Sequence, residues 1–367
     1  MDKVMIVVGT RPEIVKMAPV IRAFKKLGLP MIFVNCGQHY DYELSEVFIR
    51  DLELDQPDYG FRVKSPYQGI QTARIITYME KLLRQTSPSI VLVEGDTNTV
   101  LGTSIAAVKL GVPIGHVEAG LRSFDLRMPE EHNRRLTDHV STLLFAPTEI
   151  ARSNLVRENV WGKIHVTGNT VIDAVAQHLP IAEKKSGIMD KVRFGKFALV
   201  TAHRAENVDD PNVLQALMET FAEASVPIIF PMHPRTKKRL RQNGILAKMK
   251  SSRNIQVMEP LGYLDFLVLM KNCSLIVTDS GGMQEEATAP SIRKPTLVVR
   301  ISTERPEAVS AGFAKVVGTN KPRILKAIDE ALDQRNRLPN ISPYGDGNAA
   351  HRIAEITKKN MTYSLPK

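Results

Sequence analysis

Short apolar segments alternate with amphipathic segments along almost the whole chain. In the first half, runs of apolar and β-branched residues have the length of buried strands: VMIVVGT, MIFVNC, SIVLVEGD, PIGHVEA, LLFAPT and KIHVTG. Between these runs, the residues have the periodicity of amphipathic helices at 13–27, 68–85, 98–110 and 130–141. Continuous apolar strands that are each followed by a helix are typical of parallel sheets covered on both faces.

The same alternation restarts in the second half, where the strand-like runs are FALVTAH, VPIIFPMH, NIQVMEP, CSLIVTDS, KPTLVVR and AKVVGT. Two such halves predict an α/β protein of two Rossmann-like, doubly wound domains that face a central cleft. We expect Asp346 or Asn348 to start a last helix that crosses back to the first domain. The predicted parts are a first domain at 1–177, a linker at 178–196, a second domain at 197–345 and the C-terminal helix within 346–367.

Composition indicates a globular chain without membrane spans. Of the 367 residues, 43% are hydrophobic and 24% are charged, which suits two domains of ordinary size. No apolar stretch approaches the roughly 20 residues that cross a bilayer, and the first residues do not resemble a signal peptide. Cys36 and Cys273 lie far apart in strand-like segments, so we expect reduced thiols, a cytoplasmic protein and no metal site.

The chain carries a formal net charge of +10. Its lysines and arginines are dispersed rather than gathered in a basic stripe, which argues against a nucleic-acid partner. A lysine-rich surface accounts for most of this charge. An electropositive cleft for an anionic small molecule is compatible with the same composition.

Glycines, histidines and charged residues follow nearly every predicted strand. The segments are GTRPE, CGQHYD, EGDTN, HVEAGLR, TGNT, TAHRAEN, MHPR, TDSGG and RISTERPE. Ligands of open parallel sheets bind outside the carboxyl ends of the strands. A solvated network of ion pairs would distribute its charges over helices instead, so the pattern favours a binding site at the strand ends.

The segment TDSGGMQEEA ends a strand and opens a helix. Gly281 and Gly282 would let phosphate oxygens approach the backbone, and the helix start after Ser280 offers free amides. Glu285 or Glu286, one turn later, would reach a ribose. The same glycines also suit a simple tight turn. Because the pattern is neither G-x-G-x-x-G nor a Walker loop, it does not predict an ordinary dinucleotide or nucleotide triphosphate site.

Two Arg-Pro-Glu triplets provide candidate phosphate ligands. Arg11 and Lys16 follow the first strand, and Arg305 lies near the end of the second domain. An arginine fork suits a diphosphate, and a lysine adds a point charge. Each arginine has an alternative partner in the glutamate of its own triplet.

The candidate acids and bases are Asp96, Glu118, Glu130, Glu131 and His203. We expect Asp96 and Glu118 to end neighbouring strands and share one pocket, where crowded carboxylates raise each other's pKa. We expect Arg122 and Arg134 to keep the other carboxylates ionised. Each candidate also has a structural interpretation, as a helix cap, a residue of a first helical turn or a buried histidine.

Eight motifs, in this order, resemble those of the non-hydrolysing UDP-N-acetylglucosamine 2-epimerases: GTRPE, GQH, GDT, HVEAGLR, PEE-x-NR, T-x-H-R-x-EN, DSGG-x-QEE and ERPEA. The resemblance implies the two-domain GT-B fold and conversion of UDP-N-acetylglucosamine (UDP-GlcNAc) to UDP-N-acetylmannosamine (UDP-ManNAc) for polysaccharide biosynthesis. No carbonyl activates the hydrogen at carbon 2, so simple removal of this proton is not feasible. The resemblance implies instead that UDP is eliminated, which leaves a 2-acetamidoglucal, and that UDP is then added back on the opposite face. No cofactor and no metal are implied, and we expect a homodimer.

The resemblance also assigns roles residue by residue. The catalytic positions match Asp96, Glu118, Glu130, Arg134 and His203. The UDP-binding positions match Arg11, Lys16, Phe266, Ser280, Gly281, Gly282, Glu286 and Arg305.

The sequence departs from the family pattern at three places. The segment SFDLRM, residues 123–128, is shorter than in the better-known bacterial members of the family. Because this segment lines the sugar in the family, the identity of the sugar stays open, and Arg127 would suit the carboxylate of UDP-2,3-diacetamido-glucuronic acid. Asp41 and Tyr42 replace residues of a regulatory site for a second UDP-GlcNAc. The segment ATAPSIRKP carries extra residues and Arg293, for which the sequence suggests no function.

Two alternatives outside the epimerases stay open. A GT-B glycosyltransferase would use the same UDP-binding residues, and a nucleotide-sugar sensor would need them without the acids. The carboxylates of the first domain argue against both.

Overall fold

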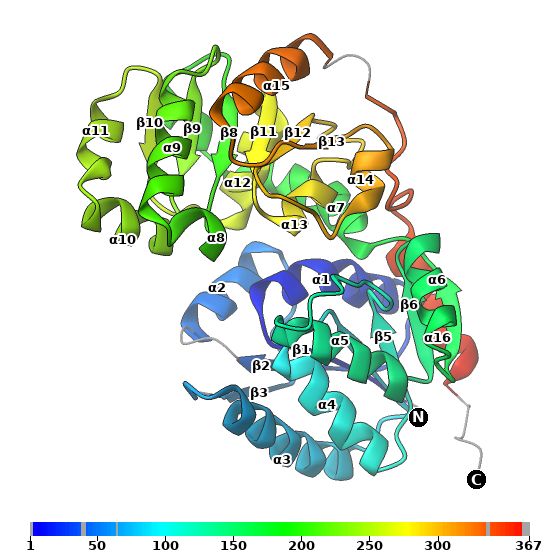
Figure 1. Cartoon of the computed structure of the whole chain (residues 1–367). Coiled ribbons are helices and arrows are strands. Elements are labelled where there is room, and N and C mark those ends of the chain that lie inside the picture. The colour runs from blue at the N-terminus through cyan, green and yellow to red at the C-terminus, as the bar shows by residue number, and fades with distance from the viewer. Residues whose placement is uncertain (1–2, 38–41, 64, 335–337, 362–367) are drawn as a thin grey trace. The chain divides into compact units, whose positions relative to one another are not determined.

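The computed structural model describes residues 3–37, 42–63, 65–334 and 338–361. Asp41 and the side chain of Tyr42, which replace residues of the family's regulatory site, lie outside the described residues. The chain divides into two compact units (Figure 1): Met1–Ala174 with Tyr344–Lys367, and Val175–Pro343. Each unit is a parallel sheet with its own helices, which confirms the predicted class of two doubly wound domains.

The sheet of the first unit has the strand order β3-β2-β1-β4-β5-β6-β7, with every pair parallel. Its strands are β1 (Val4–Val8), β2 (Met31–Gly37), β3 (Tyr59–Arg62), β4 (Ile90–Glu94), β5 (Ile114–Val117), β6 (Leu143–Ala146) and β7 (Lys163–Val166). Strand β3 is absent from the sequence prediction because it is an edge strand of alternating half-buried and exposed residues. The strand order reverses direction between β1 and β4, which makes their carboxyl ends the switch point where ligands bind.

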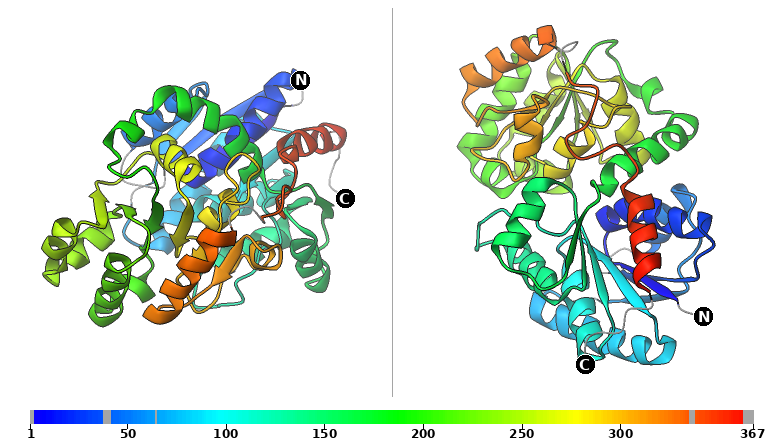
Figure 2. Two further views of the ribbon diagram at one scale, coloured as in Figure 1. Left: turned by 90° about the horizontal axis from the view of Figure 1, so that it is seen from above. Right: turned by 90° about the vertical axis from the view of Figure 1, so that its right-hand side faces the viewer.

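Helices cover both faces of this sheet. They are α1 (Arg11–Lys26), α2 (Tyr42–Asp51), α3 (Gln68–Thr86), α4 (Asn98–Lys109), α5 (Pro129–Val140), α6 (Glu149–Arg157) and α16 (Ala349–Asn360). The first residues of α7 (Thr170–Lys185) also belong to this unit, and its residues from Val175 on belong to the second. Met5 and Val7 of β1 pack with Ile75 and Met79 of α3 and Val100 of α4. Side chains of a strand alternate between faces, so the intervening residues of β1 face the other side, where α1 lies. There α1 packs against α16 (Figure 2).

Helix α16 returns the chain to the first unit, and its start is held by a residue far away in sequence. Asn348 is the N-cap residue, but its side chain makes no capping hydrogen bond. Asp346 is paired with Arg352 at 2.6 Å. The amides of Ala349 and Ala350 instead donate to the carboxylate of Asp173 in α7, at 3.2 and 2.9 Å. The side-chain cap expected from the local sequence is therefore supplied by another helix.

The sheet of the second unit has the order β10-β9-β8-β11-β12-β13, again with parallel pairs. Its strands are β8 (Ala198–Thr201), β9 (Ile228–Pro231), β10 (Ile255–Met258), β11 (Leu275–Thr278), β12 (Thr296–Val298) and β13 (Ala314–Val316). Its helices are α8 (Ala205–Val208), α9 (Pro211–Ala222), α10 (Pro234–Gln242), α11 (Ile245–Ser251), α12 (Tyr263–Asn272), α13 (Gly281–Glu286), α14 (Pro306–Ser310) and α15 (Lys321–Gln334). The switch point lies between β8 and β11.

The segment expected as a linker is partly helical. Residues 178–185 continue α7, and the short 3₁₀ helix Ile188–Lys191 follows Gly187. Leu179 and Ala182 are buried, which gives this charged stretch the apolar face that a packed helix needs.

The extra residues around Arg293 have a structural explanation. The Arg293 guanidinium donates to the carbonyls of Leu338 at 2.5 Å and Pro339 at 3.1 Å. The hydroxyls of Thr288 and Ser342 lie 2.6 Å apart. These contacts fasten the chain segment that leaves the second unit.

Candidate active site

A cavity of about 270 Å³ lies at the switch point of the first sheet. It is lined by Thr10, Pro12, Gln68, Asp96, Thr97, Asn98, Pro129, Glu130 and Asn133. Thr10 and Pro12 follow β1, and Asp96 follows β4, so the cavity occupies the position that the strand order predicts for a ligand. Two predicted catalytic residues, Asp96 and Glu130, line it together.

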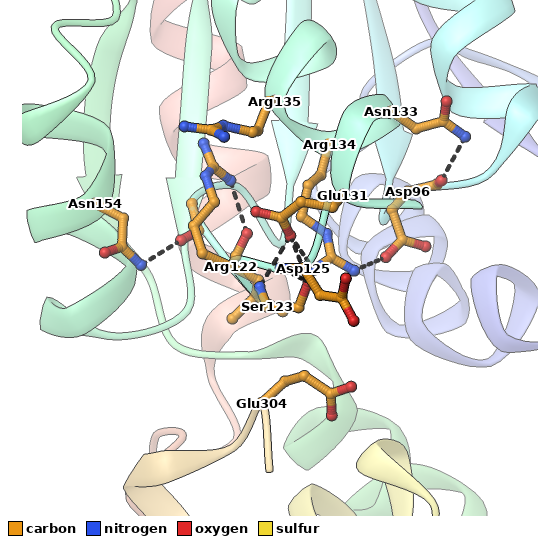
Figure 3. Close-up of polar contacts among 12 residues, drawn as sticks. Asp96, Arg122, Ser123, Asp125, Glu131, Asn133, Arg134, Arg135, Asn154 and Glu304 are labelled. Atoms are coloured by element: carbon orange, nitrogen blue, oxygen red, sulfur yellow. Dashed lines mark hydrogen bonds and ion pairs between the residues drawn. The ribbon is translucent and has the colours of Figure 1, made fainter. Parts of the chain in front are cut away.

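Arg134 of α5 connects the carboxylates at this edge of the sheet (Figure 3). It forms an ion pair with Asp96, and its Nη1 lies 3.0 Å from Oε2 of Glu131. The same oxygen of Glu131 accepts from the amide and the hydroxyl of Ser123, both at 2.9 Å. The two adjacent glutamates therefore differ: Glu131 is buried and fixes the loop before α5, whereas Glu130 is exposed to the cavity.

Glu118 lies in a different environment from the one expected. Of the described residues, those that line the cavity include Asp96 but not Glu118. Glu118 pairs with Lys16, which also lies 3.0 Å from Oε1 of Glu94, and Nδ2 of Asn169 lies 3.4 Å from Glu118 Oε2. The carboxylate that shares a partner with Glu118 is thus Glu94. Sequence reasoning missed Glu94, although a glutamate at the end of an otherwise apolar strand was a usable signal.

Arg122 serves a separate buried network. Its guanidinium lies 2.7 Å from carboxylate oxygens of both Asp138 and Glu158. Asp138 also lies 2.7 Å from Nδ1 of the fully buried His116. The expectation that Arg122 keeps the candidate catalytic carboxylates ionised is therefore wrong, because its partners are two acids that the sequence analysis did not single out.

Glu13 holds the loop after β1. Its carboxylate accepts from the Gly9 amide at 2.6 Å and from the Thr10 hydroxyl at 2.9 Å, and burial raises its pKa to about 7. These bonds fix the backbone from which the exposed Arg11 projects. The glutamate of the first Arg-Pro-Glu triplet, Glu13, thus forms hydrogen bonds with the loop that precedes the triplet.

Asp279 organises the switch point of the second sheet. This fully buried carboxylate accepts from the amides of His203 and Arg204, at 2.8 and 2.9 Å, and from Asn207 Nδ2 at 3.0 Å. Nδ1 of His203 lies 3.2 Å from the other carboxylate oxygen. Burial lowers the pKa of His203, and the Asp279 carboxylate opposes that shift. The imidazole is therefore neutral near pH 7.

The glycines that follow β11 leave open space. A Cβ built on Gly282 would meet no atom within 4 Å, and one on Gly281 would meet its nearest atoms at 3.8 Å. Packing within the protein therefore does not explain these glycines, and the backbone here is open to close approach. Ser280 is the N-cap residue of α13, and its side chain makes no capping hydrogen bond.

The two glutamates of α13 differ in their exposure and in their partners. Nε of Arg305 lies 2.5 Å from Oε1 of the buried Glu285, so this arginine does have a glutamate partner, from another element. Glu286 is partly exposed, as is Phe266 on α12. Of the two glutamates considered for a ribose, Glu286 is the accessible one.

The described residues contain no cluster of three or more His, Cys, Asp or Glu side chains that would hold a metal ion. Within the same ranges, the structure has no helix of the length and apolarity that crossing a membrane requires.

Two Rossmann-like units with polar clusters at both switch points define the class as GT-B. The chain belongs to the UDP-N-acetylglucosamine 2-epimerase family, whose sequence model matches residues 22–358. The UDP-N-acetylglucosamine 2-epimerase of Methanocaldococcus jannaschii is 44% identical over an alignment of 363 residues, and the alignment covers 96% of this chain and 98% of that protein.

A solved structure of UDP-GlcNAc 2-epimerase from Methanocaldococcus jannaschii, in complex with UDP-GlcNAc and UDP, matches with a TM-score of 0.87. That match has 44% sequence identity and covers 97% of this chain and 99% of the other. The UDP-2,3-diacetamido-2,3-dideoxy-D-glucuronate 2-epimerase of Pseudomonas aeruginosa is 36% identical over 364 residues, 97% of this chain and 99% of that protein.

Proposed function

We propose that the protein interconverts UDP-GlcNAc and UDP-ManNAc by inverting carbon 2 of the sugar. The observation that carries the proposal is the 44% identity over 96% of the chain with a named UDP-N-acetylglucosamine 2-epimerase. The cavity at the first switch point supports it, because that cavity is lined by carboxylates that can exchange a proton.

The reaction proceeds by elimination and addition. A base of the protein takes the proton from carbon 2 while the bond between carbon 1 and the diphosphate oxygen breaks. UDP leaves with that electron pair, and a 2-acetamidoglucal remains. The diphosphate oxygen then bonds to carbon 1 again, and a protein acid adds a proton to carbon 2 from the opposite face. The steps balance without an oxidant, a metal or a cofactor.

The proposed catalytic residues are Asp96, Glu118, Glu130, Arg134 and His203. We assign proton transfer to Asp96 and Glu118 first. Arg134 pairs with Asp96 and so orients its carboxylate beside the cavity that Asp96 lines. A neutral His203 is also able to accept one, and Glu130 lines the cavity beside Asp96.

The proposed UDP-binding residues are Arg11, Lys16, Phe266, Ser280, Gly281, Gly282, Glu286 and Arg305. The exposed guanidinium of Arg11 and the open space at Gly282 support contacts with phosphate oxygens. Arg305 already contacts the carboxylate of Glu285, so we propose that this carboxylate orients the guanidinium toward the diphosphate.

The alternative substrate, UDP-2,3-diacetamido-glucuronic acid, is less favoured. Arg127, which would bind its carboxylate, donates from Nε at 2.8 Å and from Nη2 at 2.7 Å to the two carboxylate oxygens of Asp125. In this bidentate pair the Asp125 carboxylate neutralises the positive charge of Arg127, which the carboxylate of a uronate would need for binding.

We further propose a cytoplasmic homodimer that acts in polysaccharide biosynthesis. The two buried, unbridged cysteines support a reducing compartment. Exposed apolar side chains on and near α5, α6 and β7 support a contact with a second copy: Leu136, Ile150, Val156, Trp161 and Val166. Sedimentation velocity on the purified protein tests the dimer.

Exchange of deuterium at carbon 2 tests the chemistry. Wild-type protein incubated with UDP-GlcNAc in deuterium oxide should yield UDP-ManNAc and label carbon 2 of both sugars. Glu118→Gln and Asp96→Asn should bind UDP but lose about 10²–10⁴ in exchange rate, because a general acid or base has been removed. Exchange at the wild-type rate in both variants would transfer the role to Glu130 and His203. No exchange with the wild-type protein would contradict the proposed function.

A further inference from the structure

Two carboxylates share one ammonium group at the carboxyl edge of the first sheet. Lys16 of α1 pairs with Glu94, the last residue of β4, and with Glu118, the residue after β5. The three side chains are 14%, 2% and 8% exposed, in that order. Nearly all of this charge is therefore removed from water.

The strand geometry explains why Glu94 meets Lys16. Val91 and Val93 of β4 pack in the apolar cluster with α3 and α4. Because side chains of a strand alternate, Glu94 faces the opposite side of the sheet, which α1 covers. An apolar residue would fill this position without the cost of removing a carboxylate from water. Packing alone therefore gives no reason for a glutamate here.

Glu118 itself is held in an uncommon conformation. Its φ is 69°, in the left-handed region that non-glycine residues seldom adopt. Such a conformation is strained and persists only where surrounding contacts fix it. Lys16 and Asn169 are among the residues that contact the Glu118 carboxylate.

We propose that Glu94 is a positioning residue, which holds the Lys16 ammonium against Glu118 and thereby fixes the carboxylate that exchanges the proton at carbon 2. The inference rests on the proposed function, in which Glu118 carries that proton. Glu94 acts through Lys16 and has no role of its own in proton transfer to the sugar. Glu94 thus adds a positioning residue to the proposed catalytic residues.

Electrostatics couple the two glutamates. Burial raises the pKa of Glu94 well above its ordinary value, the Lys16 ammonium opposes this shift, and the Glu118 and Glu13 carboxylates add to it. The coupling is reciprocal, so a charge on Glu94 disfavours the ionised form of Glu118. Replacing Glu94 by a neutral residue should therefore move the ionisation of Glu118 to lower pH.

Two variants separate the contact from the charge. Glu94→Gln keeps an oxygen that accepts from Lys16, whereas Glu94→Leu removes it. For Glu94→Leu we expect kcat to fall by about 10²-fold, with KM and UDP affinity unchanged, since misplacing a reacting group by 1 Å costs this much. Glu94→Gln should retain most of kcat. In its pH profile of kcat/KM, the ionisation assigned to Glu118 should lie below that of the wild type.

Asp173→Asn is the matched control. It also removes a buried carboxylate of the first unit, but that carboxylate contacts α16, so kcat and the pH profile should not change. The proposal is overturned by a wild-type kcat in Glu94→Leu, by equal losses in both Glu94 variants, or by loss of UDP affinity together with kcat.

A second measurement keeps the inference separate from the proposed function. Carboxyl carbon-13 titration, with the Glu118 signal assigned through Glu118→Gln, compares wild type and Glu94→Gln without substrate. A lower Glu118 pKa in Glu94→Gln supports the coupling of Glu94 to Glu118 even if the wild type exchanges no deuterium, a result that would contradict the proposed function alone. An unchanged Glu118 pKa overturns the inference. If Glu94→Leu does not fold, the carbon-13 titration of Glu118 in Glu94→Gln tests the inference alone.

Discussion

Several ionisable side chains of the candidate site contact an ionisable partner. Asp96 contacts Arg134, Glu118 contacts Lys16, and His203 contacts Asp279. Removing one partner of a buried pair leaves an uncompensated charge, which destabilises a protein by about 3–5 kcal/mol. Amide substitutions, which keep the shape and one acceptor, are therefore the variants that separate chemistry from folding.

Arg127 tests which sugar is bound. Its side chain is 90% exposed and is paired with Asp125. An exposed ion pair contributes about 1 kcal/mol or less, so Arg127→Ala should change carbon 2 exchange on UDP-GlcNAc by less than about five-fold. The measurement is the exchange rate with UDP-GlcNAc and, in parallel, with UDP-2,3-diacetamido-glucuronic acid. A large loss confined to the second substrate, with wild-type protein preferring it, would favour the alternative function.

At the scale of elements, strand ends and helix ends position the site. In the first unit the candidate residues follow β1, β4 and β5 or lie on α5, and in the second unit His203 and Ser280 follow β8 and β11. Helix α16 adds no residue to either cluster. It packs on α1, the helix that carries Lys16, so its attachment through Asp173 bears on the stability of the first unit.

Asp173 should give this attachment a pH dependence. Burial raises the pKa of Asp173 from 3.8 to about 6. The folded protein then binds a proton more tightly than the unfolded chain, so this stabilisation is complete below about pH 4 and is lost as pH rises through about 6. Two pKa units correspond to about 3 kcal/mol. The free energy of unfolding of the wild type, relative to Asp173→Asn, should fall by about that amount across the window.

Denaturant unfolding at several pH values measures the difference. Using the two proteins side by side cancels the titration of other groups, because these are common to both. A difference that is constant from pH 4 to 7 would contradict the raised pKa.

At the scale of the whole molecule, the proposed UDP-binding residues come from both units. Arg11 belongs to the first unit and Glu286 to the second. Arg11→Ala and Glu286→Ala should each weaken UDP binding by about 1.5–3 kcal/mol, as expected for a lost charge-assisted hydrogen bond.

Isothermal titration calorimetry with UDP measures these losses. Arg84→Ala is a suitable control, since Arg84 is an exposed arginine of α3 that pairs with Glu80 of the same helix. Unchanged affinity in Arg11→Ala alone would restrict the UDP site to the second unit. Unchanged affinity in both variants would remove both residues from it.

Much of the architecture was predictable because it depends on local sequence. Buried parallel strands require continuous apolar runs, and the second-half strands were all found from theirs. Strand β3 was missed because an edge strand needs no such run. The helical start of the expected linker was missed because the many charged residues there outweighed the apolar positions of Leu179 and Ala182, which are buried.

The sequence by itself determined the fold class, the family and the positions of the polar strand ends. Only the tertiary structure decided which charges meet. Lys16 and Glu118 are separated by 102 positions, and Asp173 and Ala350 by 177, so no local pattern could pair them. Their contacts follow from strand order and from the face that each helix covers. Glu94, Glu13 and Asp279 therefore emerged only when the strand ends were brought together, because burial and pairing depend on neighbours that are distant in the chain.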